Sequence, residues 1–406
     1  MGVMDGVKVL EVAQWWFVPA GGAVLADWGA EVIKVEHPVM GDAQRGLAAV
    51  GFKSTEGNVD FMMQQSNRGK RSVGIDLASP DGLEMLYRMA EQCDVFLTNF
   101  LPGARERLKI DVEHIRARNP NIIYARGSGQ GPKGPDAGKG GYDATAFWSR
   151  GGIAHALTPA DHELPIMQRA AFGDSIGAMT VAGGIAAALF ARERTGRAEV
   201  VDVSLLNTAM WVLAPDIVAS KLIAGGAGFI PKMTRTSAPN PVGNSYKTRD
   251  ERWLLLMMLQ PDKHFADFCR HVERQEWIDD ERFSDSASRF KNRKELIAML
   301  DEIFAQRTLA EWLQAFETLE GPWAPMQNAE ELHDDPQSIA NGYLPDVDGA
   351  DKGHFKLVAS PVQFDEQPIE IRSPSPEMGQ NTEEVLLELG IPWEEIARLK
   401  QAGAIN

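Results

Sequence analysis

Cysteine is nearly absent from this sequence, and long apolar runs are absent altogether. Only Cys93 and Cys269 occur among 406 residues, far apart and without the spacing of a metal-binding motif. We interpret them as buried thiols of a protein that works in a reducing compartment. No run approaches the roughly 18 apolar residues of a membrane span, and the first residues lack the parts of a signal peptide. We therefore expect a cytoplasmic protein without disulfides, a metal or a membrane-spanning segment.

Basic residues are outnumbered by acidic ones, with 41 Lys and Arg against 57 Asp and Glu. The formal net charge is −16, which would repel the phosphate backbone of a nucleic acid and argues against such a partner. The basic residues that could bind an anionic ligand lie close together in the sequence: Arg45, Lys70, Arg71, Arg105, Arg107 and Lys109. For each residue alone, a solvated face or a helix end is the commoner explanation. Gathered locally, they would let an acidic protein bind an anionic ligand.

The length of the chain suggests two domains, since 406 residues exceed the size of one ordinary core. In the first half, strand-like segments such as 7–12, 31–36 and 94–98 alternate with helix-like segments such as 80–92 and 112–118. This alternation is typical of a parallel β-sheet flanked by helices. The sequence therefore predicts an α/β fold.

The pattern changes after about residue 217. Residues 224–228 are rich in glycine, and residues 231–242 lack any periodicity, which indicates a long connection. A second α/β unit follows, with a strand-like segment at 251–258 and helices at 293–304 and 308–319. A further irregular stretch, 336–368, then leads to a final helix near 382–389.

The segment that says most about chemistry is Gly173-Asp174-Ser175-Ile176-Gly177-Ala178, which opens a helix rich in glycine and alanine. A carboxylate in the first turn of a helix lies near unpaired backbone N–H groups. An Asp can act as a nucleophile toward an activated acyl group, because its carboxylate can carry a covalent intermediate. Taken alone, an Asp that caps a buried helix is the commoner explanation.

Several other motifs accompany this segment along nearly the whole chain. They are Leu25-Ala26-Asp27-Trp28-Gly29-Ala30-Glu31, Gly41-Asp42, Asn67-Arg68-Gly69-Lys70-Arg71, Asn99-Phe100-Leu101-Pro102-Gly103, His333-Asp334-Asp335-Pro336 and Gly379-Gln380-Asn381-Thr382. Each motif is weak alone, but their order and spacing are specific. On these residues the chain resembles, and is identified as a member of, the class III coenzyme A transferases of the formyl-CoA transferase type.

The resemblance implies the organisation of the molecule. It implies a large Rossmann-like domain with a parallel sheet at 1–216 and 337–406, a linker at 217–245 and a smaller α/β domain at 246–336. It also implies an interlinked homodimer, whose threaded chains would explain the long connections. Coenzyme A would be bound as part of an acyl-CoA substrate, and the residues expected near its adenosine and phosphates are Arg45, Lys70, Arg71, Asn99 and Arg107.

The reaction that the resemblance implies moves coenzyme A from an acyl-CoA donor to a carboxylic acid acceptor. Asp174 would attack the donor thioester to form a mixed anhydride, and the released thiolate would convert it into an aspartyl-CoA thioester. The acceptor carboxylate would then reverse these steps. Family members protect such intermediates with a glycine-rich loop. The matching stretch here, near 237–244, contains Gly243 as its one glycine.

Two aromatic residues bear on the substrate and on the class of reaction. The resemblance places Tyr142 beside Asp174, with core packing as the alternative. The 2-methylacyl-CoA racemases share the fold but carry His at the position of Tyr142, and a neutral Tyr is a poor base at pH 7. Trp16 stands where formyl-CoA transferases carry Gln. With its aromatic neighbours it indicates a larger apolar acyl pocket, as in the cinnamoyl-CoA:phenyllactate transferase branch.

We therefore predict a coenzyme A transferase for medium-sized or aromatic carboxylic acids. One alternative is another enzyme of the same fold, either an acyl-CoA racemase or an isomerase that moves coenzyme A within one molecule. The other is a non-catalytic acyl-CoA-binding protein, which is disfavoured because Asp174 and its neighbouring glycines are all present.

Overall fold

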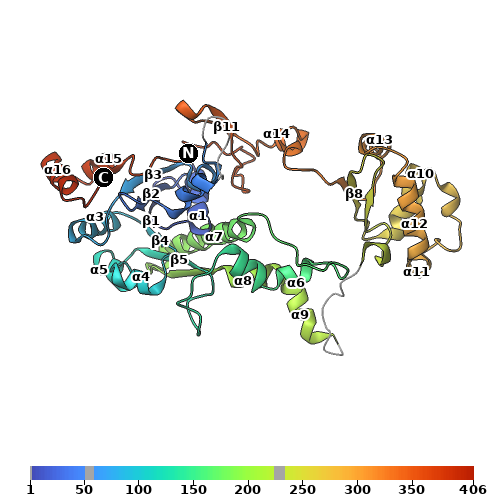
Figure 1. Cartoon of the computed structure of the whole chain (residues 1–406), viewed down its shortest axis with the longest axis horizontal. Helices are drawn as coiled ribbons and strands as arrows, with labels where there is room; N and C mark the ends of the chain where they lie inside the picture. The colour runs from blue at the N-terminus through green and yellow to red at the C-terminus, as the bar shows by residue number, and fades with distance from the viewer. Residues whose placement is uncertain (1, 51–58, 224–233) are drawn as a thin grey trace. The chain divides into compact units, whose positions relative to one another are not determined.

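A computed structural model of the chain describes residues 2–50, 59–223 and 234–406 (Figure 1). The chain divides into two compact units. The large unit consists of Met1–Leu157, Ile166–Phe229 and Pro336–Asn406, and the small unit of Thr158–Pro165 and Ile230–Asp335. The glycine-rich part of the predicted linker, 224–228, lies outside the described residues.

A six-stranded sheet forms the centre of the large unit. Its strands are β1 (Lys8–Val12), β2 (Glu31–Glu36), β3 (Lys70–Gly74), β4 (Val95–Thr98), β5 (Ile123–Ser128) and β6 (Val200–Ser204). Their spatial order is β3-β2-β1-β4-β5-β6, and every neighbouring pair is parallel. The predicted α/β fold with a parallel sheet is confirmed. The strand order reverses between β1 and β4, and in such sheets ligands bind outside the carboxyl ends of the strands at that point.

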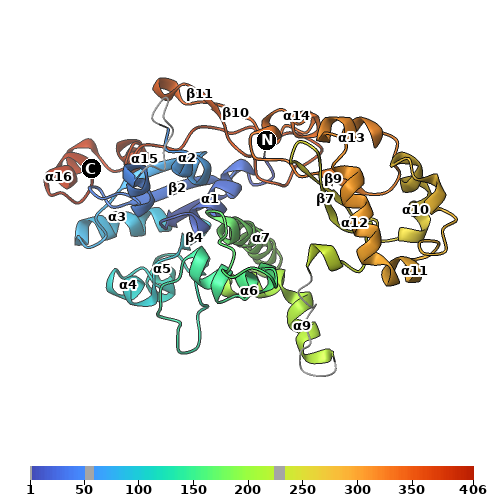
Figure 2. The same cartoon turned by 45° about the vertical axis from the view of Figure 1, so that its right-hand side comes forward.

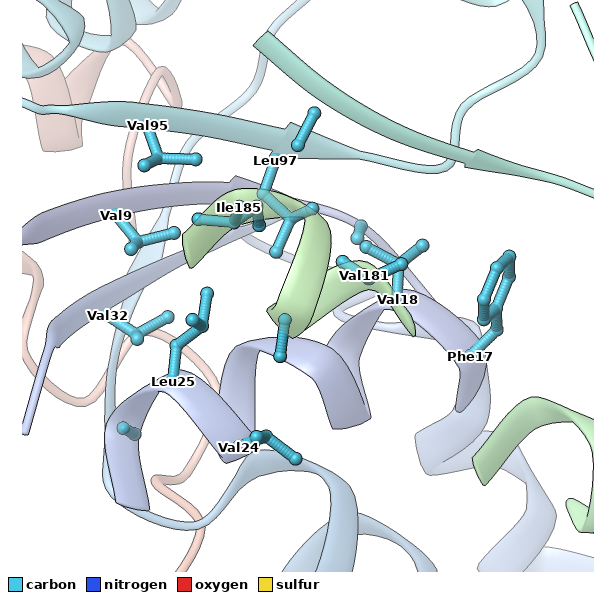
Figure 3. Packing of buried hydrophobic residues seen from close by; sticks show 14 of the residues in the cluster. Val9, Phe17, Val18, Val24, Leu25, Val32, Val95, Leu97, Val181 and Ile185 are labelled. Atoms are coloured by element: carbon cyan, nitrogen blue, oxygen red, sulfur yellow. The ribbon is translucent and has the colours of Figure 1, made fainter. Parts of the chain in front are cut away.

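The helices α1 (Phe17–Asp27) and α7 (Phe172–Thr195) cover one face of this sheet. Figure 3 shows Val9 and Leu97 of the strands pointing toward Val18 of α1 and Ile185 of α7. All four side chains are fully buried. Burial of this apolar surface fixes α1 and α7 against the strands, and with them the first turn of α7, in which Asp174 lies.

Helices from both ends of the chain cover the opposite face. They are α3 (Pro80–Ala90), α5 (Val112–Arg118), α15 (Thr382–Glu388) and α16 (Trp393–Gln401). Leu10 and Phe96 of the strands belong to the same buried cluster as Leu86 of α3 and Leu386 of α15. The strands are therefore apolar on both faces, as is typical of a buried parallel sheet.

Helix α7 is long and apolar enough to span a membrane by length and composition alone. The expectation that no segment has this property is therefore wrong for the described residues. In the fold, one side of this helix packs against α1 and the sheet through Val181, Ala182 and Ile185. Its small apolar residues allow this close packing.

Several short elements complete the large unit. They are η1 (Ala43–Val50), α2 (Phe61–Asn67), α4 (Pro102–Arg107), the π-helix η2 (Asp143–Ser149), α6 (Ile153–Leu157), α8 (Leu205–Val212), α9 (Ala214–Leu222), α14 (Pro336–Ala340), β10 (Asp346–Asp348), η6 (Ala350–Lys352) and β11 (His354–Lys356). The helix α9 occupies the beginning of the predicted linker, and α14 occupies the beginning of the second irregular stretch.

The small unit has its own sheet (Figure 2) and its own core of buried apolar side chains. The antiparallel strands β7 (Ser245–Lys247), β8 (Trp253–Leu256) and β9 (Trp323–Pro325) are accompanied by η3 (Arg235–Ser237), α10 (Pro261–His271), η4 (Gln275–Trp277), α11 (Ser286–Lys291), α12 (Arg293–Phe304), α13 (Leu309–Ala315) and η5 (Glu331–His333). Phe268, Phe304 and Trp312 lie at the centre of its core. The sequence pattern predicts the bounds of α12 to the residue.

Candidate active site

Asp174 is the third residue of α7 and lies half-buried in its first turn. The residue before it must be glycine, because a Cβ at Gly173 would overlap the ring of Phe147 and the carboxylate of Asp143. A Cβ at Gly177 would likewise overlap the ring of Phe17. The glycines of this motif therefore let the start of α7 approach η2 and α1 closely.

The start of α7 is capped by a carboxylate from another element. Ala171 adopts a left-handed conformation with φ of 59°, and its side chain makes no capping hydrogen bond. Instead, the backbone N–H of Gly173 donates to both carboxylate oxygens of Asp143, at 3.1 Å each. Asp143 is 6% exposed. Because Asp143 accepts from Gly173, the residue before Asp174, both carboxylates lie at the N-terminus of α7.

This arrangement changes the proton affinity of Asp174. Burial is the larger cause and the negative charge of Asp143 the smaller, and together they raise the pKa of Asp174 from 3.8 to about 7. Burial also raises the pKa of Asp143, and hydrogen bonds from the Gln168 side chain and from the N–H groups of Asp174 and Gly173 oppose that shift. A carboxyl group with a pKa near neutrality in a helix-end site is typical of functional sites.

Aromatic side chains surround the first turn of α7. The indole Nε1–H of Trp16 donates to the hydroxyl oxygen of Ser175 at 3.1 Å. The rings of Trp15 and Tyr142 meet edge to face, with centroids 5.5 Å apart. Tyr142 is 61% exposed, so the core-packing explanation of this residue is wrong. The structure thus brings Trp16 and Tyr142 into the neighbourhood of Asp174.

A cavity of about 250 Å³ lies at the carboxyl ends of the first four strands. It is lined by Val12, Ala13, Gln14, Val35, Glu36, His37, Met40, Gly41, Asp42, Ile75, Asp76, Leu77, Ala78, Phe100 and Leu108. Asn99 precedes Phe100 and ties two of the strand ends together. Its side-chain amide donates to the carbonyl of Gln14 at 2.6 Å and accepts from the N–H of Gln14 at 3.0 Å.

Arg107 and Arg45 occupy positions from which they could approach a ligand in this cavity. Arg107 is exposed at the end of α4 and directly precedes Leu108, which lines the cavity. Arg45 follows the lining residues Gly41 and Asp42, but its Nε and Nη2 atoms donate to Glu36 at 2.8 and 2.7 Å. Contact of Arg45, Asn99 and Arg107 with coenzyme A stays a prediction.

Lys70 lies inside the large unit and bonds other protein groups there. Its side chain is fully buried, and its ammonium group donates to Glu11, to the carbonyl of Pro19 and to Asn67 at 2.7 to 2.9 Å. These contacts use all three of its N–H donors. This corrects the prediction that Lys70 binds the cofactor, because no donor is left for a phosphate.

Arg71 lies near the amino end of β3, and its side chain reaches the amino end of β2. Its guanidinium pairs with Glu31 at the start of β2, and also with Glu384 and Glu388 of α15 at 3.2 and 2.9 Å. The cavity borders the opposite, carboxyl ends of the strands. Arg71 therefore joins α15 to the sheet, which corrects its assignment to the cofactor site.

Gly243 belongs to the small unit, where the side chain of Asn240 lies next to it. Asn240 in turn donates to the carbonyl of Met258 at 2.9 Å. The predicted role of Gly243 near the acyl intermediates stays a prediction.

Two residues of the site were not singled out by sequence reasoning. Asp143 has no part in the sequence-based prediction, although its place directly after the predicted site residue Tyr142 is an available signal. Asp42 was noted only as part of a motif. The side-chain carboxylate of Asp42 accepts from the N–H of Trp15 at 2.9 Å, a contact between separate loops that no local pattern shows.

Residues 4–382 match the family model described as CoA-transferase family III. The chain is 31% identical to (R)-2-hydroxy-4-methylpentanoate CoA-transferase from Clostridioides difficile, over 100% of both chains. It is 32% identical to cinnamoyl-CoA:phenyllactate CoA-transferase from Clostridium sporogenes, over 98% of this chain and 96% of the relative. Its fold is similar to the crystal structure of a CAIB/BAIF family protein from Brucella suis, with a TM-score of 0.83, 28% identity and coverage of 96% and 99%.

Proposed function

This chain belongs to CoA-transferase family III and is a CoA-transferase, and we propose that it works through a covalent intermediate on Asp174. The observation that carries this proposal is the position of that carboxylate. It lies in the first turn of α7, next to a second carboxylate, and the indole of Trp16 bonds the neighbouring Ser175. Its pKa of about 7 leaves a large ionised fraction at neutral pH. An ionised carboxylate is the form that attacks a thioester.

The proposed reaction consists of four balanced acyl transfers. The Asp174 carboxylate attacks the donor thioester carbonyl, so that a mixed anhydride forms and coenzyme A leaves as its thiolate. The thiolate attacks the aspartyl carbonyl, which gives aspartyl-CoA and the donor carboxylate. The acceptor carboxylate attacks aspartyl-CoA and releases the thiolate again. The thiolate finally attacks the acceptor carbonyl of the new anhydride, which yields the product acyl-CoA and free Asp174.

We propose that the nucleotide part of coenzyme A occupies the cavity at the carboxyl ends of β1 to β4. The cavity lies at the reversal of strand order, where ligands bind in folds of this type. Asn99 shapes its rim by holding Gln14, and the exposed Arg107 is placed to attract a phosphate. The acyl end would then extend toward Trp15, Trp16 and Asp174.

We propose that the acids transferred are medium-sized or aromatic. Trp16, which bonds the residue after Asp174, and the paired rings of Trp15 and Tyr142 offer large apolar surfaces. Two relatives act, by their names, on acids with a branched or a phenyl side chain. Isotope exchange tests both the function and this preference. Each acid of a panel is supplied with its own CoA thioester and carries a carbon label only in the free acid. A transferase moves the label into the thioester, and no exchange with any acid would contradict the proposal.

The racemase alternative predicts that the α-hydrogen of the acyl group exchanges with solvent. We expect no enzyme-dependent loss of the α-hydrogen of a 2-methylacyl-CoA in D₂O, because Tyr142 is a poor base at neutral pH. Tyr142→Phe should lower turnover only about tenfold, the worth of one hydrogen bond. The intensity of the α-hydrogen signal in proton NMR measures this exchange. Rapid washout of the α-hydrogen would favour a racemase instead.

We propose that the protein is a homodimer with interlinked chains. Large apolar side chains are exposed along α7, α8 and α9: Phe190, Met210, Trp211, Val218 and Leu222. Their exposure in a single chain argues for a partner surface. Sedimentation at nanomolar concentration should show a dimer, because linked chains separate only after one of them opens. A stable folded monomer of 44.6 kDa would contradict this topology.

A further inference from the structure

Trp15 has an unusual backbone conformation for a bulky residue. Its φ is 68°, in the left-handed region that favours glycine. A residue other than glycine stays in that region only when its surroundings hold it there, and such residues cluster at ligand sites. Trp15 immediately follows Gln14, which lines the cavity, and precedes Trp16, which bonds Ser175. The strained turn thus separates the proposed nucleotide site from Asp174.

Asp42 holds this turn from one side. One of its carboxylate oxygens accepts from the N–H of Trp15 and from the N–H of Gln44, both at 2.9 Å. Its other oxygen lies 2.8 Å from the ammonium of Lys34, and both side chains are fully buried. Lys34 also donates to the carbonyl of Ala13 at 2.8 Å. The buried ion pair therefore prevents the Asp42 carboxylate from rotating away from Trp15.

The indoles of Trp15 and Trp16, on this turn, make different contacts. The ring of Trp15 meets the ring of Tyr142 edge to face, with an interplanar angle of 87°. The ring of Trp16 is fixed by its hydrogen bond to Ser175. If the turn relaxed to a negative φ, the Trp15 side chain would leave Tyr142, since the direction of a Cβ depends on the backbone angles.

We propose that Trp15 is a specificity residue that forms the wall for an apolar acyl group, and that Asp42 is the positioning residue that keeps it there. This inference rests on the proposed transferase function. Through Asp42 and Gln14, which both line the cavity, the wall is attached to the site proposed for the nucleotide. The same side chains would thus define how far the acyl group lies from bound coenzyme A.

The test measures label exchange between an acid and its own CoA thioester for 4-methylpentanoate, cinnamate and acetate. The quantity of interest is the ratio of kcat/KM for the better of the two large acids to that for acetate. Asp42→Ala should lower this ratio about tenfold, since it removes one hydrogen bond that holds the wall. Asp42→Asn keeps an acceptor oxygen for the N–H of Trp15 but loses the ion pair with Lys34, so the ratio should fall less than in Asp42→Ala. The matched control is Asp94→Ala, because Asp94 also accepts from a backbone N–H, that of Lys8, and pairs with Arg192, but at the amino end of the sheet.

Trp15→Gly completes the experiment. Glycine adopts the left-handed turn without strain but lacks the wall, so this variant should also lose the preference about tenfold. Adding Asp42→Ala to it should change the ratio little, because the two substitutions remove the same feature. Equal losses for large and small acids in Asp42→Ala, or a wild-type ratio in Trp15→Gly, would overturn the inference. If Asp42→Ala does not fold, Trp15→Gly decides. Failure of the transferase proposal would differ, because wild type would then exchange no label.

Discussion

Replacing Asp174 by asparagine should lower coenzyme A transfer by about a thousandfold or more, because the amide keeps the shape but cannot form the anhydride. Label exchange between an acid and its CoA thioester measures the loss. Affinity for coenzyme A should be retained, since the cavity at the strand ends is unchanged. In wild type, acyl-CoA with hydroxylamine should leave a hydroxamate on the Asp174 peptide, detectable by mass spectrometry and missing from the variant.

The stability of Asp174→Asn provides a check that the variant is folded. The pKa of Asp174 is raised in the folded protein from 3.8 to about 7. The folded state therefore binds the proton more tightly, and wild type loses this contribution to stability as pH rises from about 4 to about 7. Asparagine does not ionise, so the variant should be more stable than wild type at pH 8 and similar at pH 4. Asp94→Asn, a carboxylate change at the amino end of the sheet, should retain turnover. Near-normal transfer by Asp174→Asn would contradict the proposed nucleophile.

Replacing Asp143 should have the second largest effect. Asp143→Ala removes the acceptor for the Gly173 N–H at the start of α7, and we expect transfer to fall about a hundredfold because the nucleophile loses its orientation. Asp143→Asn keeps an acceptor but removes a negative charge. That charge is the smaller of the two causes that raise the pKa of Asp174.

The pH dependence separates these effects. Attack requires ionised Asp174, so kcat/KM should rise with pH through the pKa of about 7 in wild type. In Asp143→Asn the rise should occur at lower pH, but still above the value of an ordinary Asp, because burial remains. Asp111→Asn is a matched control, since Asp111 caps α5 by accepting from Val112 at 2.9 Å. An unshifted rise in Asp143→Asn would show that Asp143 does not influence Asp174.

The sequence alone determined the class of fold and the place of the reactive carboxylate. The helix α12 is visible in the local pattern, because burial of one face imposes a regular spacing of apolar residues. The strand β2, which is buried on both faces, is visible as a short run rich in valine and isoleucine. The glycines around Asp174 are visible too, since close packing at Gly173 and Gly177 leaves no room for a Cβ. These are local constraints, and a linear sequence records them.

Only the tertiary structure decided which charged and aromatic residues meet. Lys70 and Arg71 are adjacent to each other and look like ligands of an anion, yet Lys70 lies buried against Glu11, 59 residues away, and Arg71 pairs with Glu388, 317 residues away. Asp143 reaches Gly173 across 30 residues, and Asp42 reaches Trp15 across 27 residues. Burial of a charge demands a partner but does not specify its position in the sequence. The packing of α7 and the strand-end loops supplies that position.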